Sequence, residues 1–357
     1  MSETGGWLRD LPQAARVRLA ASSHARLDPE PRNRLDTARA YRADLDGLRA
    51  IAVGLVILTH ARWPWVNNGG DAGVTAFFVL SGYLITNLLL GQLETRGRVD
   101  IVGFYRRRVI RLAPALLGLL AFTLMLGVIV GLTTDWRLGL LSCLVYVSNW
   151  VQVAGFNIDP LGHTWSLAIE EQFYLVWPAL IVLLRGRILY VALAGIIGGT
   201  VIRLVATGPL EYFSTITRAD AILVGCLLAL TAIRLPRWMG GVALATLVGI
   251  AAINADHDLT IGIAMIATAI VIVARVEALG FLAAIGRRAY SLYLWNWPMT
   301  LLFGTMGPLA PLLTVLAAEV SYRLLEAPMM HRGGRPVVKR ARSTWSLLRW
   351  SRARPSA

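Results

Sequence analysis

The chain divides into a polar first stretch and a long series of apolar segments. Residues 1–45 are polar and charged, whereas eleven apolar segments follow before residue 327. A bilayer core about 30 Å thick is crossed by roughly 20 helical residues, with about 17 as a lower limit. Most of the segments approach that length, so the pattern predicts an all-α integral membrane protein. The segments are 48–66, 73–90, 112–132, 138–153, 165–184, 188–206, 219–233, 238–254, 258–275, 288–305 and 308–326.

The distribution of basic residues reduces eleven segments to ten crossings. Cytoplasmic loops of membrane proteins are enriched in Lys and Arg. The basic loop 91–111 and both chain ends are therefore expected in the cytoplasm, and two cytoplasmic ends require an even number of crossings. Segment 138–153 is short and precedes the turn-rich residues 155–162. We predict that this segment is re-entrant or interfacial, which is tolerated where it is buried in protein or lines a cavity.

Three parts follow from this pattern. We expect a flexible cytoplasmic tail over residues 1–44, a transmembrane domain over 45–330 and a basic cytoplasmic tail over 331–357. No internal repeat is evident, so the inverted-repeat signature of many transporters is missing.

Composition excludes several other classes of protein. Hydrophobic residues make up 56% of the chain and charged residues 16%, against about 45–50% and 25% in soluble domains. The chain is therefore too apolar for a soluble enzyme or a disordered protein. Cys143 and Cys226 both lie inside apolar segments. We interpret them as core residues, and we predict no disulfide and no metal site.

A net charge of +14 would suggest nucleic acid as a partner if the protein were soluble. Here the basic clusters flank apolar segments, which is the pattern of the positive-inside rule. We therefore predict that the protein lies in a lipid bilayer and does not bind nucleic acid.

The first apolar segment contains an ionisable residue, His60. Arg49 precedes it by eleven residues, which places both side chains on one helix face about 16 Å apart along the axis. Asp46 falls within about 40° of the same face. Ionisable groups within a membrane span are costly and are functional candidates. The alternative is that His60 only forms a hydrogen bond to a neighbouring helix.

A second polar group lies at the start of segment 165–184. It contains His163, Trp165, Glu170, Glu171 and Tyr174. Two adjacent carboxylates cannot both face lipid, so at least one is expected to point into the bundle. The alternative is a pair at the outer interface, where water and a helix N-terminus favour the charge.

Arginines cluster before the third span. Arg106, Arg107, Arg108 and Arg111 occur within six residues, and Arg108 and Arg111 share a helix face. Guanidinium groups bind phosphates through paired hydrogen bonds. A plain cytoplasmic anchor is the alternative interpretation.

Weaker candidates are found further along the chain. We expect Arg218 and Asp220 to form a pair at the entrance to a span, and Glu326 is a further acidic residue in the last span. The run 290–298 mixes aromatic and polar residues, and its alternative is an aromatic belt with a proline-broken helix end.

Taken together, these segments resemble acyltransferase family 3, a family of membrane O-acyltransferases that includes bacterial surface-glycan O-acetylases. The similarity extends over about residues 41–330. In one departure, Asn296 occupies a position where the family usually has His. The matching segments are Leu45 to Ala50 with His60, Phe77 to Ile85, Phe104 to Arg111 with Pro114, His163 to Pro178, Arg218 to Asp220, Tyr290 to Pro298 and Glu326 to Pro328.

The resemblance implies transfer of an acyl group, commonly acetyl, from acyl-CoA to a hydroxyl of a sugar-containing acceptor, in a bacterial inner membrane. Acyl-CoA would be a co-substrate, and no bound cofactor is expected. The implied catalytic residues are His60 as base or acyl carrier, with Glu170 or Glu171 orienting it or binding the acceptor. The implied donor-binding residues are Asp46, Arg49, Arg107, Arg108 and Arg111. His163, Trp165, Tyr174 and Asn296 are expected to bind the acceptor or to be structural.

A transporter or flippase of a lipid-linked or acylated small molecule is the alternative function. Such a protein would use the same buried charges as a substrate pathway and would need no acyl donor.

Overall fold

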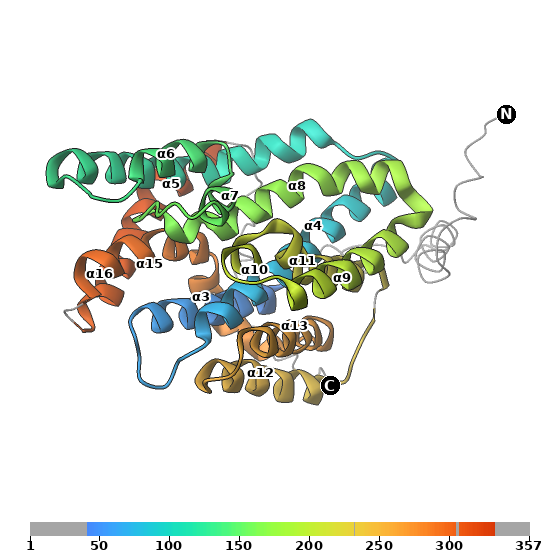
Figure 1. Ribbon diagram of the computed structural model, residues 1–357. Coiled ribbons are helices and arrows are strands. Elements are labelled where there is room, and N and C mark those ends of the chain that lie inside the picture. Colours follow the sequence, from blue (N-terminus) through green and yellow to red (C-terminus); the bar gives the residue numbers. More distant parts are fainter. Residues whose placement is uncertain (1–40, 232, 305–306, 333–357) are drawn as a thin grey trace, which may run out of the picture.

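The computed structural model describes residues 41–231, 233–304 and 307–332, and within these ranges the chain is helical with no strand. The tails predicted over 1–44 and 331–357 lie almost wholly outside these residues. Figure 1 shows a bundle in which α4 lies near the centre, with α12 and α13 on one side and α5, α6 and α8 on the other. The longer helices are α3 (Ala43–His60), α4 (Gly69–Arg96), α5 (Ile101–Val130), α8 (Trp165–Leu184), α9 (Ile188–Val205), α11 (Thr215–Thr231), α12 (Arg237–Ala252), α13 (His257–Ala274), α15 (Ala289–Phe303) and α16 (Leu309–Ser321).

Shorter elements connect these helices or extend their ends. They are α6 (Trp136–Leu144), α7 (Ser148–Val153), η2 (Gly162–Thr164), η3 (Arg185–Arg187), α10 (Pro209–Phe213), η4 (Glu277–Leu282), α14 (Ala283–Gly286), the π-helix η6 (Tyr322–Glu326) and α17 (Ala327–Arg332).

Each of the ten predicted spans coincides with one of the longer helices. Among the described residues, six stretches are long and apolar enough to cross a membrane: Gly69–Arg96, Ile101–Val130, Gly162–Leu184, Ile188–Val205, Pro209–Thr231 and His257–Ala274. The other four predicted spans are not among these six stretches. Helices α12, α15 and α16 are too short, and α3 contains several charged residues. The all-helical membrane class is confirmed, and the count of ten crossings stays a prediction.

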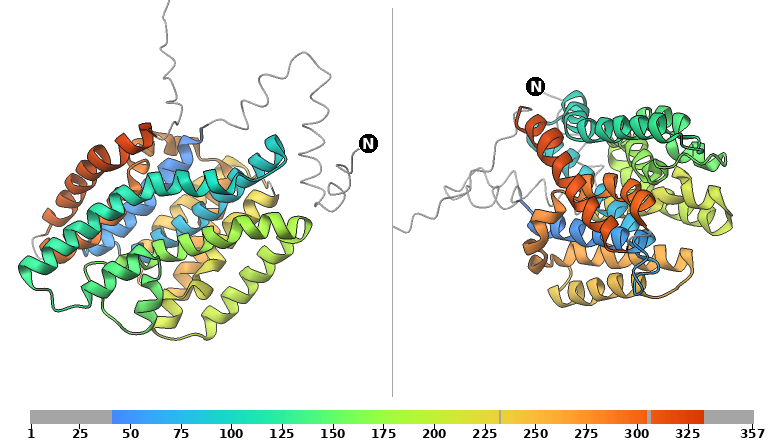
Figure 2. Two further views of the ribbon diagram at one scale, coloured as in Figure 1. Left: turned by 90° about the horizontal axis from the view of Figure 1, so that it is seen from above. Right: turned by 90° about the vertical axis from the view of Figure 1, so that its left-hand side faces the viewer.

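Segment 138–153 does not form one helix. It is divided between α6 and α7, and Tyr146, at the break, has a φ of 54°. The nine residues of α6 extend over only about 14 Å, too little to cross a bilayer. The prediction that this segment is not a single span is confirmed. Figure 2 shows both short helices on the same side of the bundle as α5 and α8.

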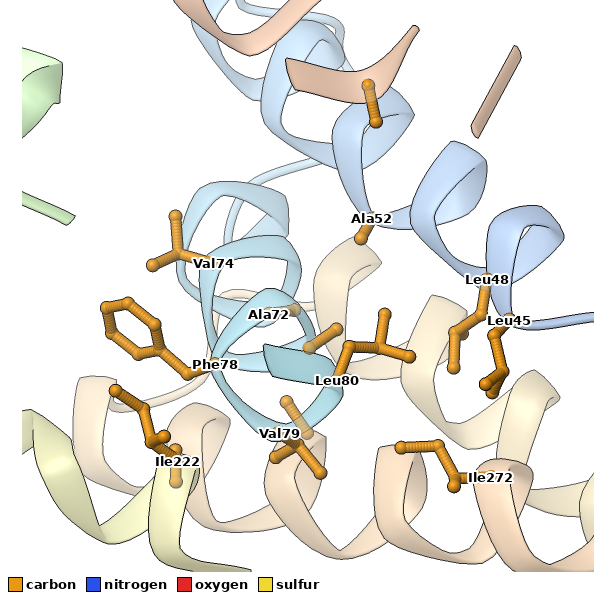
Figure 3. Close-up of a cluster of buried hydrophobic side chains, with 14 of the residues drawn as sticks. Leu45, Leu48, Ala52, Ala72, Val74, Phe78, Val79, Leu80, Ile222 and Ile272 are labelled. Atoms are coloured by element: carbon orange, nitrogen blue, oxygen red, sulfur yellow. The ribbon is translucent and has the colours of Figure 1, made fainter. Parts of the chain in front are cut away.

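Apolar side chains from four helices form the centre of the bundle. Leu48 of α3, Phe78 and Val79 of α4, Ile222 of α11 and Ile272 of α13 are each at most 1% exposed (Figure 3). This core fixes α3 and α4 against one another. Both predicted core cysteines are buried and free, and no cluster of metal-binding side chains occurs in the described part of the chain.

Helices α4 and α11 touch through their backbones at two glycines. A Cβ built on Gly82 would lie 1.8 Å from the Ile222 carbonyl oxygen, and one on Gly225 would lie 2.0 Å from that of Val79. Any side chain at either position would therefore collide with backbone of the facing helix. Small residues permit this close approach in membrane bundles, where packing replaces the hydrophobic effect between helices.

We expect Gly82→Ala to lower the thermal stability of the protein in nanodiscs. Separating two backbones costs about 1–3 kcal/mol by analogy with overpacked cores. The matched control is Gly91→Ala on the same helix, where an added Cβ meets no atom within 4 Å. Equal melting temperatures for the two variants would contradict the assigned contact.

The start of α5 is fixed by a capping interaction. The Asp100 carboxylate accepts a hydrogen bond from the Gly103 backbone N–H at 2.9 Å. This bond, together with Arg107, holds the pKa of the Asp100 carboxyl below its usual range. An anionic cap opposes the positive end of the helix dipole and sets where the following arginines lie along α5.

Candidate active site

Two neighbouring cavities lie in the described part of the bundle. The larger one, of about 540 Å³, is lined by four arginines and is called the basic cavity. The smaller one, of about 260 Å³, is lined by His60 and is called the His60 cavity. Val74 and Tyr293 line both, so the two cavities share a wall formed by α4 and α15.

Most of the predicted donor-binding side chains come together in the basic cavity. Arg49 of α3 and Arg107, Arg108 and Arg111 of α5 line it, and Glu170 of α8 also does so. The excess of positive charge suits a ligand that carries phosphate groups. Asp46 lies behind this wall, where its carboxylate accepts hydrogen bonds from Arg49 at 2.9 Å and from the Tyr41 hydroxyl at 2.5 Å.

The two adjacent glutamates of α8 have different partners. Glu170 lines the basic cavity and accepts a hydrogen bond from the Ser81 hydroxyl at 2.8 Å. Glu171 instead forms an ion pair with Arg108 at 2.6 Å. The guanidinium of Arg108 also lies 3.6 Å from the ring centre of Tyr174. The expectation that at least one carboxylate points into the bundle is confirmed.

His60 is the last residue of α3, and its partner is Asn296 of α15. Nδ1 of the imidazole forms a hydrogen bond with Oδ1 of Asn296. A carbonyl oxygen only accepts, so Nδ1 donates and the proton of the neutral ring lies there. The Trp297 ring lies against the imidazole, with 4.7 Å between ring centres. Within the described ranges, His60 contacts neither Glu170, which lines the basic cavity, nor Glu171, which is paired with Arg108.

The wall between the cavities is held by hydrogen bonds from Tyr293. Its hydroxyl lies 2.6 Å from the Ser166 hydroxyl and donates to the His163 carbonyl at 2.9 Å. His163 and Trp165 line the His60 cavity, whereas Ser166 lines the basic cavity. The start of α8 therefore contributes side chains to both.

One predicted pair is not formed. Arg218 and Asp220 share α11 but do not contact each other through their side chains. Asp220 is paired with Arg203 of α9 at 3.2 Å, and Arg203 also pairs with Asp258 of α13. Residues two apart on a helix point in different directions, which is the physical reason. The Arg218 guanidinium lies over the Trp165 ring instead, 5.2 Å from its centre.

Sequence reasoning did not single out Tyr293 as a shared wall or Asp159 as a cavity residue. Asp159 lies in the turn before η2, and its carboxylate accepts a hydrogen bond from the Trp297 indole N–H at 2.7 Å. The sequence around Asp159 does not indicate that it lines a cavity. Its partner Trp297 belongs to α15, and only the folding of α15 against this turn brings the two side chains together.

This geometry defines a helical membrane protein with a basic cavity that meets a histidine-lined one. The acyltransferase domain family matches residues 42–321, and the chain belongs to this family, acyltransferase family 3. The resemblance noted in the sequence is thereby confirmed.

Curated relatives support the same assignment. The O-acetyltransferase OatA of Staphylococcus aureus is 33% identical over 349 residues, which cover 82% of this chain and 58% of the relative. The peptidoglycan O-acetyltransferase OatA of Listeria monocytogenes is 31% identical over 354 residues, with 83% and 57% covered. The chain thus spans less than two thirds of the length of these relatives. No solved structure matches the chain.

Proposed function

We propose that this protein is a membrane O-acetyltransferase that moves an acetyl group from acetyl-CoA to a hydroxyl of a sugar-containing acceptor. The observation that carries the proposal is the pair of cavities meeting at Tyr293. One supplies arginines for phosphates and the other supplies an oriented imidazole. The named activity of the relatives, O-acetyl transfer, supports the same chemistry.

The donor occupies the basic cavity in this proposal. Arg49, Arg107 and Arg111 bind the phosphates of CoA from the cytoplasmic side, where the positive-inside rule places this end of α5. The pantetheine arm then passes Tyr293 toward His60. Arg108 also lines this cavity, where its pair with Glu171 fixes the position of its charge beside the phosphates.

His60 acts as the base on the acceptor. With Nδ1 bonded to Asn296, Nε2 has the lone pair that takes the proton from the acceptor hydroxyl. The hydroxyl oxygen attacks the thioester carbonyl carbon, and the C–S bond breaks as the tetrahedral intermediate collapses. The imidazolium returns its proton to the departing thiolate, so that the products are the acetyl ester and free CoA.

His60 as an acyl carrier uses the same nitrogen. Nε2 would then attack the thioester itself and pass the acetyl group to the acceptor in a second step. Ping-pong kinetics would identify this route, whereas a dependence of the rate on both substrates together would identify the base.

A radiolabel assay tests the proposal. Membranes containing the protein are incubated with [acetyl-¹⁴C]acetyl-CoA and an acceptor glycan, and free CoA and labelled glycan are measured. We expect both to form in equal amounts. If the glycan remained unlabelled and the CoA thioester intact, the result would favour a transporter or flippase.

A further inference from the structure

The His60 cavity has the opposite charge character to its neighbour. None of the described residues that line it is Lys or Arg, and its one acidic group is Asp159. Apart from tyrosine and tryptophan, its other polar side chains are the imidazoles His60 and His163 and the amides Gln152 and Asn157. Such walls repel a phosphate or carboxylate and suit an uncharged ligand with several hydroxyl groups.

Aromatic rings form most of the remaining wall. Trp165, Tyr212, Phe213, Tyr293 and Trp297 all line the cavity. An apolar, aromatic lining with a few fixed polar groups is typical of small-molecule sites. The flat C–H face of a sugar ring can pack on such side chains while its hydroxyls reach the polar ones.

Asp159 is held in one position while part of its carboxylate stays available. Oδ1 accepts the Trp297 N–H at 2.7 Å, and the backbone N–H of Asp159 donates to Asn157 Oδ1 at 3.1 Å. A Cβ on Gly162 would lie 2.6 Å from Asp159 Oδ1, so the absence of a side chain at this position lets the carboxylate occupy its place. Oδ2 makes no hydrogen bond to any residue in the described part of the chain and can accept from a ligand hydroxyl.

His163 gives an independent sign of a missing partner. It is 5% exposed and lines the cavity. The Leu294 backbone can serve one ring nitrogen at most, so at least one nitrogen has no hydrogen-bond partner among the described residues. Buried polar atoms are rarely left unpaired. A hydroxyl-rich ligand in the cavity would supply the partner.

We propose that the His60 cavity is the acceptor subsite and binds a neutral sugar ring through the Asp159 carboxylate, His163 and the face of Trp297. The inference rests on the proposed function only in taking His60 as the reacting group. Trp297 contacts both His60 and Asp159, so it sets the distance between the hydroxyl that reacts and the hydroxyls that are bound. The sugar is recognised at its hydroxyls and not at an attached acidic group.

Binding without chemistry provides the test. The full chain in nanodiscs is studied by saturation-transfer NMR with N-acetylchitotetraose as a neutral probe and tetragalacturonate as an acidic one. We expect the wild type to bind the neutral probe and to reject the acidic one. Asp159→Ala is expected to raise the Kd for the neutral probe at least tenfold, whereas Glu277→Gln, in an exposed ion pair with Arg237, leaves it unchanged.

A second variant separates binding from folding. Trp297→Phe keeps an aromatic ring but removes the N–H that holds Asp159, and we expect it to weaken binding severalfold at an unchanged melting temperature. The proposal is overturned if Asp159→Ala and Trp297→Phe both bind as the wild type does, if the wild type does not bind the neutral probe, or if it binds both probes equally. Sugar binding without cleavage of acetyl-CoA would contradict the proposed function and leave the subsite standing.

Discussion

Replacing His60 with alanine is expected to lower kcat for acetyl transfer by about 10²–10⁴-fold, the usual loss when a general base is removed. Asn296 accepts a hydrogen bond from Nδ1 of this imidazole, which leaves Nε2 free to act as the base. His60→Gln should be equally inactive, because an amide does not take up a proton. Purified protein in nanodiscs, acetyl-CoA and a labelled glycan give the measurement.

The control for this result is His331→Ala. His331 belongs to α17, 34 residues after Trp297, the last residue that lines either cavity. We expect it to retain wild-type kcat. A His60→Ala variant with undiminished transfer would remove His60 from the mechanism.

The same assay tests whether Asn296 orients the His60 imidazole. Asn296→Leu takes away the acceptor for Nδ1–H and should reduce kcat, while Asn296→Asp keeps an acceptor and adds a negative charge. That charge favours the imidazolium, so the acidic limb of the kcat–pH profile should move to higher pH. A merely structural asparagine would leave the position of this limb unchanged.

Replacing Arg111 with alanine is expected to raise KM for acetyl-CoA by about 10–100-fold with a smaller change in kcat. One charge-assisted hydrogen bond to a phosphate contributes about 1.5–3 kcal/mol, which converts to this range. Arg111 lines the basic cavity beside Arg107 and Arg49. Initial rates over a range of acetyl-CoA concentrations give both constants.

A truncated donor makes this test specific to phosphate. S-acetylpantetheine has the thioester but no phosphate, so wild type and Arg111→Ala should use it equally poorly. Arg237→Ala, in an exposed ion pair remote in sequence from the cavity, serves as the matched arginine control. If Arg111→Ala used the truncated donor less well than the wild type does, Arg111 would stabilise the cavity wall and would not bind the phosphates.

Much of the bundle could be predicted because lipid imposes a simple rule on length and polarity. Every predicted span coincides with a helix, and the short length of segment 138–153 was sufficient to predict that it is not a single span, whereas its division into α6 and α7 was not predicted. The position of Asp46 beside Arg49 also followed from helix periodicity alone, and the structure shows the two side chains in contact.

Partners from distant parts of the chain could not be predicted in the same way. Periodicity places Glu170 and Glu171 on different faces but does not say that Arg108 takes one and Ser81 the other. Likewise, Asn296 follows His60 by 236 residues, and only the packing of α15 on α3 brings the amide to the imidazole. The sequence showed Asn296 as a departure from the family pattern, while its partner depended on the fold.

The backbone contact between α4 and α11 limits how the bundle can move. At Gly82 the backbone of α4 lies directly against the Ile222 carbonyl of α11. Because no side chain separates them, a change of rotamer cannot let one helix slide along the other. The two helices therefore form a fixed frame against which the other helices pack. The wall between the two cavities depends on one phenol of α15, because the Tyr293 hydroxyl is hydrogen-bonded to both the Ser166 hydroxyl and the His163 carbonyl at the start of α8.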